Sequence, residues 1–198
     1  MFPLFESIRI IEGELQNLGW HQKRFEQSYE KLFGIKTNSK LYSKIRIPAE
    51  YKRGNVKLRF LYNKDSYAYN FSKYTPVKIY TLKMVIKNNI DYSLKYTDRS
   101  DLNYLFELRG DCEDILIIKN GLITDSSISN IVFYDGKSWV TPLKPLLKGA
   151  CRERLIPEGK ISPIDITVDD LKNFSKFKLI NAMRDFEEQE GSDISGIK

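Results

Sequence analysis

Four short segments of the sequence carry side chains that could do chemistry. They are the HQKR segment at residues 21–24, Lys95 with Arg99, the stretch from Asp125 to Asn130, and the LKGACR segment at residues 147–152. A lysine amine can form an imine with a carbonyl group and can afterwards act as a base. A glycine that opens a helix presents unpaired N–H groups and a positive dipole end to phosphate. The positive charge in these segments suits an anionic small molecule.

Each segment also has an ordinary structural interpretation. A lone histidine such as His21, at the start of an amphipathic helix, is more often a surface or capping residue than a catalyst. Arg24, one turn later, is usually solvated, and nothing in the composition or periodicity distinguishes Lys95 from a surface lysine. Many helices begin like the one at Gly149 without binding a ligand. No segment taken alone therefore identifies a function.

The hydrophobic pattern of the first half predicts strands around one long helix. Residues 4–11 alternate as a strand, and residues 18–33 have apolar side chains at helical spacing before Gly34. A shorter helix is predicted over 40–47. The stretches 56–62 and 67–71 alternate with period two around a polar turn, which indicates a hairpin.

The second half reads as a mixture of strands and short helices. The pattern predicts a helix within 98–108, another over 149–156, and strands at 161–168 and 177–182. Between residues 114 and 142, Asn-Gly and Asp-Gly turns separate three strands, which we interpret as a meander. A composition shift near residues 87–89 is the predicted domain boundary, giving domains 1–86 and 87–198.

Length and composition exclude several classes of protein. The 198 residues, 41% of them hydrophobic, suffice for one large or two small domains with a real core. No apolar run reaches the roughly 18 residues that a membrane helix needs, and the N-terminus does not resemble a secretory signal. The net charge of +6 is dispersed along the chain, so no nucleic-acid partner is predicted. Two cysteines without a nearby histidine predict no metal site, and we expect a cytoplasmic protein.

The order of the chemical segments resembles the class IV aminotransferase family, from Phe5 to about Arg184. The FESIR segment at 5–9 is similar to the family's FE-T/G-IR strand, and HQKRF at 21–25 is similar to its H-x-x-R-L helix. Lys95 and Arg99 form the K-x-x-x-R version of its lysine motif. The remaining matches are the acid-to-asparagine stretch at 121–131, the LKGACR turn at 147–152 and the INA loop at 180–182.

The resemblance implies a pyridoxal 5′-phosphate (PLP) enzyme of α+β class, with a small α/β domain and a larger, β-barrel-like domain. It implies that Lys95 carries the cofactor as a Schiff base and that Arg24 grips the phosphate. It also implies that Asp125 faces the pyridine nitrogen and that the chain forms a homodimer. The other cofactor-binding positions implied are Asn130, Gly149, Ala150, Cys151, Asn181 and Ala182.

The sequence departs from the family pattern at three points. The acid is Asp125 where glutamate is commoner, and it is one methylene shorter. Cys151 stands where a phosphate-binding threonine is frequent, which removes a hydroxyl donor. The chain begins at the FE-T-like strand, without the strand and tyrosine that many relatives carry before it. Either another group is expected to cover that side of the pocket, or the pocket is open there.

Two reactions fit the resemblance. The K-x-x-x-R motif and the hydroxyl of Ser7, which could protonate a leaving pyruvate, favour an aminodeoxychorismate lyase of the folate branch. Arg59 is a candidate for the substrate carboxylate, although an outward-facing strand arginine is equally compatible with the alternation around it. The alternatives are a branched-chain or D-amino-acid aminotransferase, and a non-catalytic relative that binds PLP or another anion.

Overall fold

The computed structural model describes residues 1–41, 43 and 45–198, and it divides into two compact units. Unit 1 comprises residues 1–76 and 94–98, and unit 2 comprises residues 77–93 and 99–198. The sequence predicted one domain boundary, near residue 87. In the structure the short segment 94–98 returns to unit 1, so Lys95 belongs to that unit.

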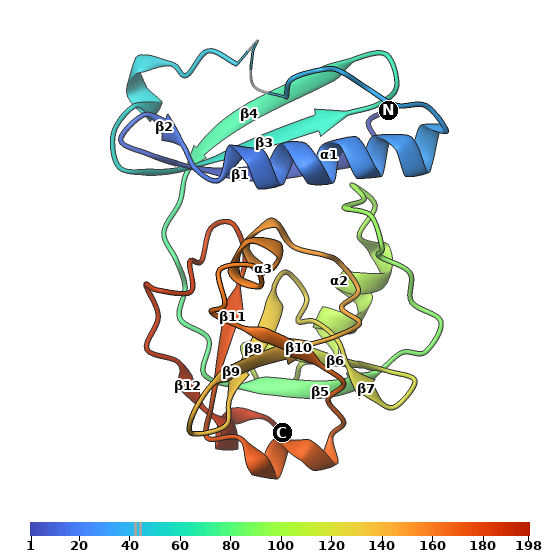
Figure 1. Cartoon of the computed structure of the whole chain (residues 1–198), viewed down its shortest axis with the longest axis vertical. Coiled ribbons are helices and arrows are strands. Elements are labelled where there is room, and N and C mark those ends of the chain that lie inside the picture. The colour runs from blue at the N-terminus through green and yellow to red at the C-terminus, as the bar shows by residue number, and fades with distance from the viewer. Residues whose placement is uncertain (42, 44) are drawn as a thin grey trace. The chain divides into compact units, whose positions relative to one another are not determined.

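Unit 1 is a four-stranded antiparallel sheet covered on one face by a helix (Figure 1). Its strand order is β2-β1-β3-β4. The elements are β1 (Leu4–Ile11), β2 (Glu14–Leu15), α1 (Leu18–Phe33), the 3-10 helix η1 (Ala49–Tyr51), β3 (Asn55–Tyr62) and β4 (Tyr67–Lys73). The predicted strand, long helix and hairpin are therefore confirmed.

Side chains alternate between the two faces of each strand, and this explains why the sheet has one apolar face. Leu4, Ile8 and Ile10 of β1 are fully buried, and Val56 and Leu58 of the neighbouring β3 lie beside them. The helix ends where the sequence predicted, because Gly34 adopts a positive φ of 72° and its N–H donates to the carbonyl of Glu30. The helix predicted over 40–47 includes residues 42 and 44, which lie outside the described residues. Residues 45–48 have no regular structure.

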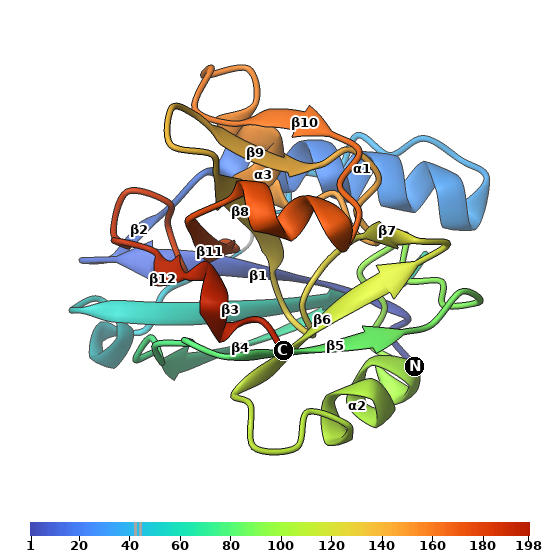
Figure 2. The same cartoon turned by 90° about the horizontal axis from the view of Figure 1, so that it is seen from below.

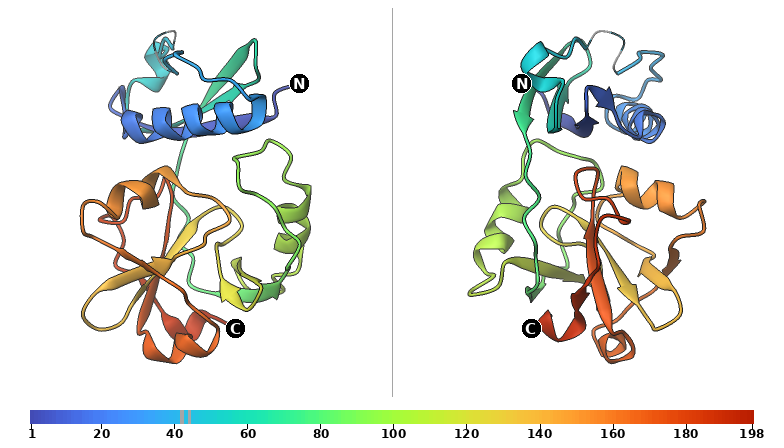
Figure 3. Two further views of the ribbon diagram at one scale, coloured as in Figure 1. Left: turned by 45° about the vertical axis from the view of Figure 1, so that its right-hand side comes forward. Right: turned by 90° about the vertical axis from the view of Figure 1, so that its left-hand side faces the viewer.

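Unit 2 contains two open sheets rather than the barrel-like domain that was expected. A three-stranded sheet has the order β5-β6-β7, and a five-stranded sheet has the order β10-β9-β8-β11-β12. No closed barrel is present in the described part of the chain, because each sheet has two edge strands. Figure 2 shows α2 beside β5 and β6, and Figure 3 shows the twisted strands of the larger sheet in yellow to red.

The elements of unit 2 are short. They are β5 (Leu82–Ile86), α2 (Ser100–Glu107), β6 (Asp114–Lys119), β7 (Leu122–Ile123), β8 (Asn130–Tyr134), β9 (Trp139–Pro142), α3 (Ala150–Leu155), β10 (Ser162–Ile164), η2 (Asp169–Asn173), β11 (Lys176–Ile180), β12 (Ser192–Asp193) and η3 (Ile194–Gly196).

The predicted meander over 114–142 was wrong. Its strands divide between the two sheets, with β6 and β7 in one and β8 and β9 in the other. The chain changes sheet in the segment 124–129, which leads from β7 to β8. One apolar cluster joins both sheets, since Leu116 and Ile118 of β6 contact the same core as Ile131 and Phe133 of β8.

No helix among the described residues is long and apolar enough to cross a membrane.

Candidate active-site residues

A buried ion cluster joins the first strand of unit 1 to its helix. Glu6 on β1 is fully buried, and its two carboxylate oxygens accept hydrogen bonds from both motif residues of α1. The Nε of Arg24 donates to Glu6 at 2.8 Å, the Nη2 of Arg24 also contacts the carboxylate, and the Nδ1 of His21 lies 2.7 Å from it. One turn of helix separates His21 from Arg24, so both side chains reach the same carboxylate. Glu6 therefore fixes the orientation of the Arg24 guanidinium.

The cluster keeps Glu6 ionised and His21 neutral. Burial raises the pKa of Glu6, but the Arg24 charge and the hydrogen bonds from His21 and Arg24 outweigh it and lower the pKa to about 2. Burial lowers the pKa of His21, and the hydrogen bond and charge of Glu6 only partly oppose that effect. A neutral imidazole beside a carboxylate must carry its proton on Nδ1, so Nδ1 donates to Glu6.

Replacing Glu6 by glutamine is expected to lower stability by about 3 kcal/mol, because it leaves the Arg24 charge without its carboxylate. The folded pKa of about 2 lies below the ordinary 4.5, so the contribution of Glu6 is complete above pH 4.5 and is lost as the pH falls toward 2. Urea unfolding across that range should show an acid-dependent loss in the wild type that E6Q lacks. The control is E14Q, at an exposed position on β2. An acid limb that is equal in wild type and E6Q would contradict this role.

Lys95 is anchored to the first strand through its backbone. The Phe5 N–H donates to the Lys95 carbonyl at 3.0 Å, and Leu4 forms an isolated bridge with Tyr96. The Thr97 N–H and hydroxyl donate to the carbonyls of Pro3 and Phe2, at 2.8 and 2.6 Å. The lysine thus lies in an irregular segment whose position β1 determines.

Lys95 shares the Phe5 ring with the predicted substrate arginine. The Lys95 Nζ lies 4.7 Å from the ring centroid, and the Arg59 guanidinium carbon lies 4.1 Å from it. Ser7 pairs directly with Arg59 across β1 and β3, so Phe5, Ser7 and Arg59 lie on one face of the sheet, opposite α1. Arg59, Ser7 and Lys95 are all half-buried. The structure thus brings together three of the residues that the sequence singled out.

In unit 2 the predicted acid is held by two hydrogen bonds. Asp125 is buried, its Oδ1 accepts from the Asn130 amide at 2.7 Å, and its Oδ2 accepts from the Leu147 N–H at 2.9 Å. The same Asn130 amide also donates to the Leu147 carbonyl at 2.8 Å. These contacts join the start of β8 to the loop before α3. The acid and the predicted phosphate turn therefore form one rigid group.

Burial dominates the titration of Asp125. It raises the pKa of Asp125 from 3.8 to about 6, although hydrogen bonds from Leu147 and Asn130 and the charge of Arg152 act in the opposite direction. The carboxylate is mostly ionised at neutral pH, and a protonated nitrogen nearby would hold it so.

Gly149 is required by its contact with Asn130. A Cβ at position 149 would lie 2.1 Å from the Asn130 Oδ1, and that side chain is already held by Asp125 and Leu147. We expect G149A to lower stability by about 1–3 kcal/mol, as overpacking of a rigid site does. The control is G19A in α1, where nothing lies within 4 Å of the added Cβ. Equal melting temperatures for G149A and wild type would contradict this account.

The remaining predicted residues of unit 2 have structural contacts of their own. Cys151 is buried in α3, and burial, together with the Asp185 charge, raises its pKa to about 11, so the thiol is neutral. The Asn181 amide donates to the Ser129 hydroxyl at 2.8 Å, and Ala182 is half-buried. Arg99 donates to the Ser127 carbonyl at 2.9 Å. Ala150 is buried in the first turn of α3.

The family model for class IV amino-transferases matches residues 3–186. The chain belongs to the class IV aminotransferase family. The family is PLP-dependent, and its fold is the mixed-sheet α+β fold described above. Unit 1 carries an amine at Lys95 and a guanidinium at Arg24, and unit 2 carries a buried carboxylate at Asp125 and a glycine turn at 149. Each of these groups has chemistry that suits this cofactor.

Two relatives illustrate the family membership, and a third protein shares the fold. An uncharacterized protein of Haemophilus influenzae is 44% identical over 186 residues, which cover 92% of this chain and 98% of that protein. A crystal structure from Haemophilus somnus, provisionally named as a 4-amino-4-deoxychorismate lyase, is 34% identical with a TM-score of 0.83, covering 94% and 98% of the two chains. A hypothetical aminotransferase of Mycobacterium tuberculosis in its PLP-bound form shares the fold, with a TM-score of 0.77 at 15% identity, covering 100% and 81%.

The sequence analysis missed the residues that hold the site residues in place. It gave Glu6 no role, although an acid on the inward face of a strand beside an H-x-x-R helix is a signal for an internal ion pair. It also could not predict the hydrogen bond from the Leu147 N–H to Asp125, because every residue other than proline has a backbone N–H donor.

Proposed function

We propose that this chain is a PLP-dependent lyase that converts 4-amino-4-deoxychorismate to 4-aminobenzoate and pyruvate. The observation that carries the proposal is the grouping of Lys95, Arg59 and Ser7 around Phe5. The substrate has two carboxylates, one of which the Arg59 guanidinium suits, and its leaving pyruvate needs a proton donor. The lyase name of the relative from Haemophilus somnus supports the same reaction.

Each residue has a defined part in this reaction. Lys95 carries the cofactor and takes the proton from the ring carbon that bears the amino group. The bond from the ring to the enolpyruvyl oxygen then breaks, and the Ser7 hydroxyl supplies a proton to the leaving group. Arg59 binds a carboxylate of the substrate. The products account for every atom of the substrate, so no other reactant is needed.

Other residues bind and tune the cofactor. In unit 1, Arg24, oriented by Glu6, is the proposed phosphate-binding residue. In unit 2, the proposed phosphate-binding groups are the backbone N–H groups at residues 149–151 and the loop at Asn181 and Ala182. Asn130 holds Asp125 in place. When bound, PLP supplies a carbonyl for the lysine and a ring that accepts electrons, which an ionised Asp125 favours by keeping the ring nitrogen protonated.

The test is to follow 4-aminobenzoate by its fluorescence after 4-amino-4-deoxychorismate is added to the PLP-loaded protein. We expect product in the wild type, and a higher KM with little change in kcat for R59Q. The matched control is R53Q, at an exposed position before β3. Transfer of an amino group to 2-oxoglutarate without 4-aminobenzoate would instead identify an aminotransferase. Absence of both activities and of PLP binding would support a non-catalytic relative.

The assembly and location are also proposals. A homodimer is the state proposed for the active protein, and light scattering of the purified chain tests it. A cytoplasmic location is proposed as well, and fractionation of cells that express the chain tests it.

A further inference from the structure

Unit 2 contains a buried arginine whose charge is not balanced. Within the described residues, three arginines have a buried Nε that lacks a hydrogen-bond partner, at positions 152, 154 and 184. The Arg152 guanidinium contacts Glu153 and donates to the Pro142 carbonyl at 2.9 Å. No ion pair or side-chain hydrogen bond in the described part of the chain includes Arg184, although this residue is only 8% exposed. A buried guanidinium needs hydrogen-bond acceptors, and it always keeps its charge.

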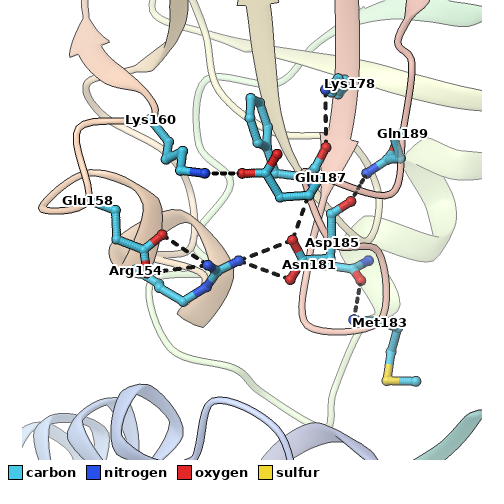
Figure 4. Close-up of polar contacts among 10 residues, drawn as sticks. Arg154, Glu158, Lys160, Lys178, Asn181, Met183, Asp185, Glu187 and Gln189 are labelled. Atoms are coloured by element: carbon cyan, nitrogen blue, oxygen red, sulfur yellow. Dashed lines mark hydrogen bonds and ion pairs between the residues drawn. The ribbon is translucent and has the colours of Figure 1, made fainter. Parts of the chain in front are cut away.

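Two carboxylates close to Arg184 in sequence, those of Asp185 and Glu187, are bound to other cations (Figure 4). Both oxygens of Asp185, the next residue, accept from Arg154, at 3.1 and 2.9 Å. Glu158 also accepts from Arg154, and Glu187 is paired with Lys160. Neither Asp185 nor Glu187 therefore neutralises Arg184. With no side-chain partner among the described residues, its guanidinium is open to a counter-ion from outside the protein.

The turn that carries Arg184 is fixed beside the candidate site of unit 2. Asn181 and Arg184 exchange two backbone hydrogen bonds, of 3.2 and 3.1 Å. The Asn181 amide then donates to Ser129 and to the Ile128 carbonyl. Residues 128 and 129 lie in the loop whose ends are Asp125 and Asn130. The unbalanced arginine is thus anchored to the same loop as the buried acid.

We infer that Arg184 binds an oxyanion of a ligand of this enzyme, either the cofactor phosphate or a substrate carboxylate. The planar guanidinium suits both groups, since each offers two oxygens to its parallel N–H donors. The ligand assignment rests on the proposed function, whereas the charge imbalance does not.

The experiment compares wild type, R184M and R154M as full-length chains. In the ligand-free state R184M is expected to melt at the same or a higher temperature than wild type, because it removes an uncompensated buried charge. R154M is the matched control and should melt lower, since it breaks pairs with Asp185 and Glu158. If R184M does not fold, R184K takes its place. A lysine keeps the charge but loses the bidentate fork.

Calorimetric titrations identify the anion. We expect R184M to lose about tenfold or more in affinity for one of two probes, while R154M retains it. If R184M loses affinity for PLP and inorganic phosphate but binds pyridoxal as wild type does, the anion that Arg184 binds is the cofactor phosphate. Loss for pyruvate or 4-aminobenzoate, with PLP binding intact, assigns a substrate carboxylate. If R184M binds all of these as wild type does, the inference is overturned. Inorganic phosphate and carboxylates can be titrated even if the wild type proves not to bind PLP, so failure of the proposed function is distinguishable.

Discussion

Replacement of Lys95 by alanine is expected to lower the rate of 4-aminobenzoate formation by about a thousandfold or more. The reason is that the proposed mechanism gives one amine two tasks, attachment of the cofactor and transfer of the proton. Retention of PLP through gel filtration should fall as well, because the proposed covalent attachment is lost. Fluorimetric assay and the visible spectrum of the desalted protein measure the two effects.

The matched control is K57A. Lys57 is another half-buried lysine of unit 1, and its Nζ lies 5.9 Å from the ring centroid of Tyr74. It should keep both activity and bound cofactor. A K95A variant as active as wild type, with K57A equally active, would show that the amine of Lys95 takes no part in the reaction.

Replacement of Asp125 by asparagine should lower turnover by about a hundredfold while changing PLP affinity far less. Asparagine keeps the shape and one acceptor, so the contact with the Asn130 amide survives, whereas the charge and the acceptor for the Leu147 N–H are removed. Steady-state assays with saturating PLP give turnover, and fluorescence titration gives the affinity. D114N is the control, because Asp114 is another buried aspartate that accepts backbone hydrogen bonds, from Ile115 and Ser127.

The same variant has a defined pH dependence of stability. The folded pKa of Asp125, about 6, lies above its ordinary 3.8, so the folded protein holds this proton more tightly than the unfolded chain. Ionisation therefore costs stability as the pH rises from about 4 to about 6, reaching about 3 kcal/mol above that range. D125N lacks this cost. The free energy of unfolding of D125N relative to wild type should therefore rise by about 3 kcal/mol between about pH 4 and about pH 6. A difference that does not change with pH would contradict the account of Asp125.

Much of unit 1 could be predicted because its sequence pattern is local. The alternation of β1, the helical spacing of α1 and the glycine that ends it are each encoded within a few residues. The register that places Ser7 opposite Arg59 pairs β1 with β3, which are not consecutive strands, and alternation alone left the orientation of Arg59 open. The contacts of its guanidinium with Phe5 depend on the three-dimensional arrangement.

Unit 2 was harder to predict because its contacts are long-range. The turn signals at Asn120-Gly121 and Asp135-Gly136 were correct, since β6 pairs with β7 and β8 pairs with β9 across them. The change of sheet between the two hairpins has no turn signature, so the strands were assigned to one meander. Likewise, the return of Lys95 to unit 1 depends on a backbone hydrogen bond from Phe5 that no periodicity predicts.

The central claim, that Lys95 carries PLP, is tested most directly by mass spectrometry. The wild-type protein is incubated with PLP, reduced with borohydride, freed of excess cofactor and digested. The account predicts a phosphopyridoxyl group on the peptide that contains Lys95, in close to one copy per chain, and none on that peptide in K95A. A label on a different lysine, or no stable label on any peptide, would contradict it.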